Sequence, residues 1–150
     1  MAERYVRPNW FTRNVFNRTV AWLTQLGISV YGSRVLAVRG RRSGLWHTVP
    51  VNLLEYRGER FLVAPRGVTE WVRNVRAGSD AELRLGSRRE RTRLIEIPDS
   101  EPLKIELLRA YLRKWAFEVG VFFEGVDAKA SDEALRRIAP NHPVFRVLPA

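Results

Sequence analysis

Apolar residues between positions 8 and 27 recur three and four residues apart, and polar residues lie between them. This spacing predicts an amphipathic helix that is basic and rich in aromatic side chains. Asn9 is placed to cap its first turn, and Gly27 is placed to end it. Such a helix packs on the core of its own domain or on a second subunit, or else it lies on a membrane surface. The sequence leaves these alternatives open.

From residue 35 onward the pattern changes to short apolar or alternating runs separated by turns, which is typical of β-strands. Gly58 and Gly86 stand in two of the turns and predict hairpins. The run 61–64 is apolar throughout, which predicts a strand buried on both faces. Alternating arginines in the run 88–97 predict one exposed, basic face. The expected strands are 35–38, 45–56, 61–64, 81–85, 88–97 and 144–148.

Helical spacing returns at 69–77, again from residue 102 to residue 119, and in a short segment that Ser131 caps and Pro140 ends. The connection 120–125 fits neither pattern. About six strands with hairpin connections favour one antiparallel barrel with helices at its start and near its end. We therefore expect a mainly β (α+β) fold.

The length of 150 residues predicts a single domain over the whole chain. There is no cysteine and there are only two histidines, which excludes disulfides, cysteine-bound metals and a site of several histidines. No signal peptide or spanning segment is recognisable, so we expect a cytoplasmic protein. The net charge is +10, almost entirely from arginine, which suits nucleic acid, an anionic membrane or a small polyanion. The alternative explanation of the arginine content is the base composition of the genome, which has no bearing on function.

Two stretches carry candidate chemistry. In the first, Gly40 and Gly44 enclose Arg41, Arg42 and Ser43 between two expected strands. Glycines let a backbone approach a ligand, and guanidinium groups suit phosphate and carboxylate, so this is either an anion-binding loop or a solvated basic turn.

The second stretch begins at Pro65, Arg66 and Gly67 and opens the expected helix 69–77. A loop that opens a helix offers free N–H donors to an anion. Within the helix, Trp71 is predicted to anchor the core, and Asn74 either caps backbone groups or touches a ligand.

The histidines offer little for catalysis. His47 follows the first loop on a strand and is predicted to be a surface or packing residue, and His142 is predicted to lie in a turn. No Ser-His-Asp arrangement and no pair of carboxylates is recognisable. If the chain is an enzyme, a bound cofactor carries the chemistry.

The two stretches together resemble a known family. G-R-R-S-G at Gly40–Gly44, with Pro50 and Val51, is similar to the signature T-G-R-K/R-S/T-G followed by P-L/V in the deazaflavin-dependent nitroreductase and quinone reductase family. The family then has A-S/P-x-G and W-x-x-N-L/V, which here are A-P-R-G at 64–67 and W-V-R-N-V at 71–75. Two departures are His47, where members often have a basic residue, and Pro65, where many have Ser.

The resemblance implies a split β-barrel related to flavin reductases and a binding site for coenzyme F-420 (8-hydroxy-5-deazaflavin), in preference to FMN or FAD. The cofactor residues that it implies, or that lie in the matching segments, are Arg41, Arg42, Ser43, Gly44, His47, Pro50, Ala64, Pro65, Arg66, Gly67, Trp71 and Asn74. Tyr111 is a candidate proton donor.

The function implied is an oxidoreductase that passes a hydride from the reduced coenzyme to a quinone or nitro compound. The alternative is a non-catalytic carrier of a flavin, tetrapyrrole or lipid-like ligand on the same barrel. We expect a homodimer, and residues 8–27 are a candidate contact with a membrane. Nucleic acid ranks below both functions, since the basic residues are dispersed and no nucleic-acid motif is present.

Overall fold

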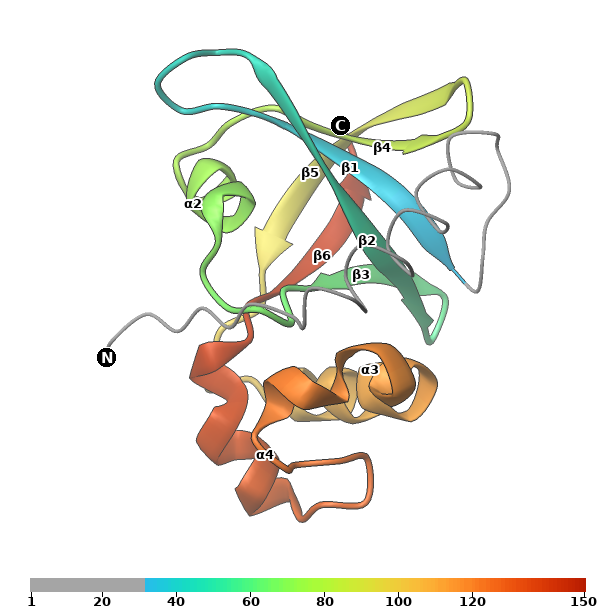
Figure 1. Cartoon of the computed structure of the whole chain (residues 1–150), viewed down its shortest axis with the longest axis vertical. Coiled ribbons are helices and arrows are strands. Elements are labelled where there is room, and N and C mark those ends of the chain that lie inside the picture. Colours follow the sequence, from blue (N-terminus) through green and yellow to red (C-terminus); the bar gives the residue numbers. More distant parts are fainter. Residues whose placement is uncertain (1–31) are drawn as a thin grey trace.

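The computed structural model describes residues 32–150, which form a closed six-stranded antiparallel barrel with helices outside it (Figure 1). The predicted helix at 8–27 lies outside the described residues. The strands are β1 (Ser33–Arg39), β2 (Trp46–Tyr56), β3 (Glu59–Val63), β4 (Ala81–Leu85), β5 (Arg88–Glu96) and β6 (Val144–Pro149). The order around the barrel is β1-β2-β3-β6-β5-β4, and β4 closes it by pairing with β1.

The helices are α2 (Glu70–Arg76), α3 (Pro102–Val119) and α4 (Asp132–Ile138), with short 3-10 turns η1 (Gly120–Phe123) and η2 (Ala139–Asn141). This confirms the predicted α+β class and the six antiparallel strands. The connection that fitted neither pattern is largely η1. Ser131 caps α4 as predicted, because its Oγ accepts a hydrogen bond of 3.1 Å from the Ala134 N–H. Pro140 lies inside η2 and therefore does not end the helical path at once.

The same strands bury apolar side chains on both faces. Inward-facing residues such as Leu36, Val38 and Leu62 fill the barrel. On the outer face, Phe61 and Val63 pack against α3, η1 and α4 in a second cluster. This arrangement confirms the prediction that the apolar run 61–64 is buried on both faces.

The two ends of the barrel are closed differently. At one end α2 places Trp71 and Val75 against the barrel interior. Towards the other end, side chains of the inward-facing rows become charged, and Arg60 forms a forked pair with Glu90 in which both N···O distances are 2.7 Å. The β1–β2 loop lies at the α2 end, and α3 and α4 cover the opposite side of the molecule (Figure 1).

None of the helices among residues 32–150 combines the length and the apolar character that crossing a bilayer requires.

Candidate functional site

The loop Gly40–Gly44 is a compact turn that joins β1 to β2. The Gly40 N–H donates to the Leu45 carbonyl at 2.8 Å, and the Gly44 N–H donates to the Gly40 carbonyl at 2.9 Å. Gly44 has φ +71°, which glycine adopts readily and other residues rarely do. Arg42 and Ser43 form the exposed tip of this turn.

Gly40 is favoured at its position for a different reason, which is space. A Cβ atom at this position would lie 2.6 Å from Ser43 Oγ and 3.0 Å from His47 Nε2. Ser43 and His47 therefore pack directly over the backbone of Gly40. The structure thus brings His47, which the sequence placed only on a strand past the loop, against the loop itself.

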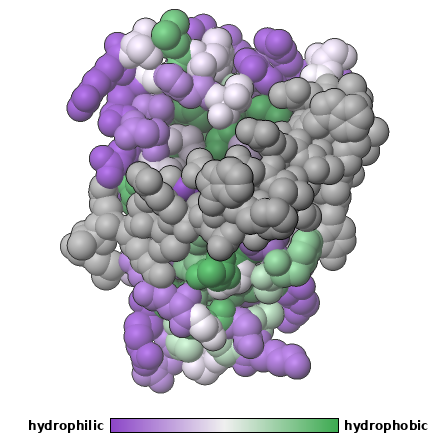
Figure 2. Space-filling model, viewed as in Figure 1, coloured by the Kyte–Doolittle hydropathy of each residue, from purple (hydrophilic) through white to green (hydrophobic). Residues whose placement is uncertain are grey.

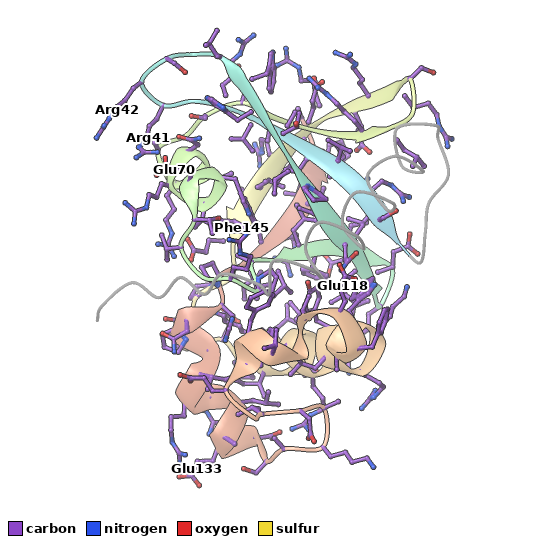
Figure 3. All side chains as sticks on the ribbon, in the orientation of Figure 1. Arg41, Arg42, Glu70, Glu118, Glu133 and Phe145 are labelled. Carbon is purple, nitrogen blue, oxygen red and sulfur yellow. The ribbon has the colours of Figure 1, made fainter. Side chains whose placement is uncertain are left out.

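Arg41 connects the loop to α2. Its backbone N–H donates to Asn74 Oδ1 at 3.0 Å, and its Nη1 donates to the same oxygen at 2.9 Å and to Glu70 Oε2 at 2.8 Å. Asn74 is 4% exposed, so its side chain is a fixed acceptor inside the protein. The two stretches that the sequence analysis selected are therefore joined through Arg41 and Asn74, and Figure 3 shows Arg41 and Glu70 side by side.

Glu70 was not selected from the sequence. Its role depends on a partner 29 positions earlier, and its place directly before Trp71 was the only signal available. The hydrogen bond from Arg41 lowers the pKa of the Glu70 carboxyl from its ordinary value, and the charges of Arg73 and Arg42 act in the same direction. Glu70 is consequently ionised at neutral pH.

Arg39 supports the other side of the loop. Its Nη1 donates to the Gly44 carbonyl at 2.9 Å, and its guanidinium lies 4.5 Å from the centre of the Trp46 ring. Arg84 and Arg91 approach the same ring at 5.6 and 5.4 Å. This cation–π cluster holds the end of the β1–β2 hairpin against β4 and β5.

The loop keeps a set of donors that the described residues leave unused. The N–H groups of Arg42 and Ser43 make no hydrogen bond within residues 32–150, and neither do Nε and Nη2 of Arg41. The Arg42 side chain forms no ion pair within the same residues and points away from the body of the protein (Figure 3). Two backbone amides and two guanidinium groups at one turn are the types of donor that bind phosphate.

The segment 64–67 is held by a different part of the molecule. The Ala64 N–H donates to the Pro143 carbonyl at 2.8 Å, and the Pro65 carbonyl lies 2.9 Å from Nδ1 of His142. His142 is 1% exposed and stacks on Phe123, with 4.0 Å between the ring centres. The predicted turn residue is thus also a core residue, because it fixes this segment. Gly67 is buried with φ +92°, and Arg66 is half-buried just before it.

Two other predicted site residues, Trp71 and Pro50, lie on α2 and β2. Trp71 is partly buried and packs against the core, with its ring centre 5.5 Å from that of Phe145, which confirms it as an anchor. Pro50 is exposed on β2 and faces Val35 in the ladder.

Tyr111 is 1% exposed and packs against Trp115 and Phe123 on the α3 side, away from the loop (Figure 1). Burial raises the pKa of its phenol, so it releases a proton less readily, and its role as a proton donor stays a prediction.

Solved structures with a similar fold include one described as a domain-swapped dimer, with 16% identity, a TM-score of 0.56 and coverage of 92% of this chain and 97% of the other. A structure of an F420-H2-dependent reductase has 15% identity, a TM-score of 0.55 and coverage of 78% and 94%. The heme storage protein HutZ from Vibrio cholerae has 9% identity, a TM-score of 0.54 and coverage of 89% of both chains. At these identities the likeness shows the fold alone.

A comparison with curated proteins gave no match. In contrast, one protein-family model matches most of the 150 residues. Residues 11–122 match the F420H(2)-dependent quinone reductase family, and the chain therefore belongs to this family of oxidoreductases.

Proposed function

We propose that this protein uses reduced coenzyme F-420 to reduce a small electron-poor acceptor, either a quinone or a nitro compound. The observation that carries the proposal is the donor set at Gly40–Gly44, held in place by the contact between Arg41 and Asn74. The name of the family, which specifies F420H(2) dependence, supports the choice of cofactor. The loop supplies a reason why this chain can hold it, because the coenzyme carries a phosphate and a polyglutamate tail.

The residues divide the work of binding. The N–H groups of Arg42 and Ser43 and the open edge of Arg41 would hold the phosphate, and Arg42 would neutralise part of the tail. His47, packed over Gly40, closes one side of the same loop. Arg66 and Gly67 would extend the cradle from the start of α2. Trp71 and Asn74 would support the site without touching the ligand, because Trp71 fixes α2 against the barrel and Asn74 fixes it to the loop.

Reduction of a quinone takes a hydride and a proton. Coenzyme F-420, bound in its reduced form, would supply the hydride, and Arg41, Arg42 and Ser43 would hold its phosphate. The proton comes from water or from a side chain at the acceptor, which gives the hydroquinone. The contribution of this chain is placement of the two reactants and exclusion of side reactions.

The direct test is turnover. Purified protein is mixed with reduced coenzyme F-420 and a panel of quinones and nitroaromatic compounds, and oxidation of the coenzyme is followed by its absorbance. We expect enzyme-dependent oxidation with at least one acceptor and none without an acceptor. Saturable binding of the coenzyme with no turnover across the panel would favour the carrier function instead.

We also propose that the protein is a homodimer. A neighbour of the same fold is described as a domain-swapped dimer, and light scattering of the purified chain tests whether this chain assembles likewise. A cytoplasmic location and a membrane contact through residues 8–27 remain predictions from the sequence.

A further inference from the structure

Asn74 and Glu70 hold Arg41 in different ways, although both accept from Nη1. Asn74 is 4% exposed and accepts two hydrogen bonds from Arg41, one of them from the backbone. The Glu70 side chain is 75% exposed and accepts a single hydrogen bond of 2.8 Å. Asn74 is therefore the main anchor of Arg41, and the exposed ion pair with Glu70 adds little to stability.

Although Glu70 contributes little to stability, its negative charge affects the electrostatics of the site. A carboxylate oxygen 2.8 Å from Nη1 offsets part of the positive charge of Arg41. An anion that binds Nε and Nη2 of Arg41 would lie on the other edge of the same guanidinium group. The Glu70 carboxylate would therefore repel it. Figure 3 shows Glu70 directly beside Arg41, with Arg42 extending beyond both.

We infer that Glu70 competes with the anionic ligand for Arg41 and thereby lowers the affinity of the site for that ligand. This inference rests on the proposed function, because it concerns the same anion site. Repulsion between two unit negative charges about 6 Å apart in water weakens the binding constant of an anion about 3-fold. For a dianion the repulsion energy is roughly twice as large. Removing the charge of Glu70 should therefore raise affinity for an anion by about 3- to 10-fold.

The substitution that tests this is Glu70→Gln, which keeps an oxygen acceptor for Arg41 and removes only the charge. Glu133→Gln is the matched control, because Glu133 is also exposed, also pairs with an arginine (Arg137), and lies at the opposite end of the molecule (Figure 3). Both variants lose one negative charge, so an effect of net charge alone appears equally in both.

Two probes are titrated into wild type and both variants at low ionic strength: oxidised coenzyme F-420, followed by its fluorescence, and inorganic pyrophosphate, followed by the NMR signals of the Arg42 and Ser43 amides. We expect Glu70→Gln to bind both probes about 3- to 10-fold more tightly than wild type and Glu133→Gln to match wild type. The gain should shrink as salt is added, because screening weakens the interaction.

The outcomes separate the two proposals. Equal or weaker binding of both probes by Glu70→Gln overturns the competition and makes Glu70 a positioning residue or a bystander. If Glu70→Gln gains affinity for pyrophosphate while no variant binds the coenzyme, the competition stands and the proposed cofactor is wrong. If wild type and Glu70→Gln bind neither probe, the anion site itself is wrong and both proposals fail.

Discussion

Asn74 Oδ1 accepts two hydrogen bonds from one residue, the backbone N–H of Arg41 at 3.0 Å and its Nη1 at 2.9 Å. The first fixes the path of the loop and the second fixes the direction of the guanidinium. Because both end on one side chain that is buried, Asn74 ties the loop to α2. A single amide thus couples the two stretches of sequence on which the proposed site depends.

Asn74→Ala should therefore lower both stability and binding. The backbone N–H of Arg41 loses its acceptor, and a part-buried hydrogen bond of this kind contributes about 0.5–1.5 kcal/mol. The free energy of unfolding, measured by urea denaturation, should fall by about this amount, and coenzyme affinity should fall at least 10-fold. Asn74→Asp, which keeps the acceptor oxygen, should recover most of the stability. Equal losses in the two variants would show that the double hydrogen bond is not the cause.

Gly40→Ala tests the close packing of the loop. Its Cβ would lie 2.6 Å from Ser43 Oγ, so the hydroxyl must move and its hydrogen bond from the Leu45 N–H is disturbed. We expect a loss of about 1 kcal/mol in unfolding free energy, in line with mild overpacking. The double variant Gly40→Ala with Ser43→Ala removes the nearest clash and should recover part of that loss. A double variant less stable than Gly40→Ala alone would contradict this account.

The pair Arg60–Glu90 predicts a dependence of stability on pH. The hydrogen bond from Arg60 lowers the pKa of the Glu90 carboxyl, although burial opposes the shift. A lowered pKa in the folded state means that the pair stabilises the protein above the unfolded pKa of about 4.3 and stops doing so as pH falls through the lower, folded value. The effect should be about 1 kcal/mol or less, because Glu90 is partly exposed.

Urea denaturation of wild type and Glu90→Gln at neutral pH and below about pH 4 measures this contribution. The difference in stability between the two proteins should be present at neutral pH and shrink in acid. A difference that stays constant across this range would exclude the linkage.

Lys104 and Asp99 form a second ion pair whose energetic balance is testable. Lys104 is 0% exposed and its Nζ pairs with Asp99, whose side chain is 53% exposed. Asp99→Ala leaves a buried ammonium group without its partner and should cost about 2–3 kcal/mol. In a Lys104→Met background the same change should cost little, because no charge is left to pair. Equal costs in both backgrounds, measured by thermal unfolding, would mean that the pair does not act as one.

The fold was largely predictable because its signals are local. Residues 81–85 and 88–97 were assigned from alternation and from the turn at Gly86, and the structure gives Ala81–Leu85 and Arg88–Glu96. The start of β3 was less predictable, since Glu59 is charged and exposed and only its pairing with Tyr56 makes it part of the strand.

For the site, the sequence predicted which residues take part but not how they contact one another. The sequence selected Arg41 and Asn74 but did not pair them, because 33 positions separate them and the contact depends on how α2 packs against the barrel. Glu70 was missed for the same reason. Tyr111 was proposed as a proton donor, whereas the structure buries it on α3 against Trp115, a contact that only the packing of the helix reveals.

The central claim is that the Gly40–Gly44 loop binds the anionic part of coenzyme F-420, and an equilibrium titration of the coenzyme at low salt tests it most directly. Three proteins are compared: wild type, Arg41→Ala with Arg42→Ala, and the control Arg136→Ala with Arg137→Ala. The control pair lies in the last turn of α4, at the other end of the molecule, and loses the same charge. We predict saturable binding by wild type and control, and at least a 100-fold loss in the loop variant while its circular dichroism is unchanged. Equal affinity in all three proteins, or no binding by wild type, would contradict the account.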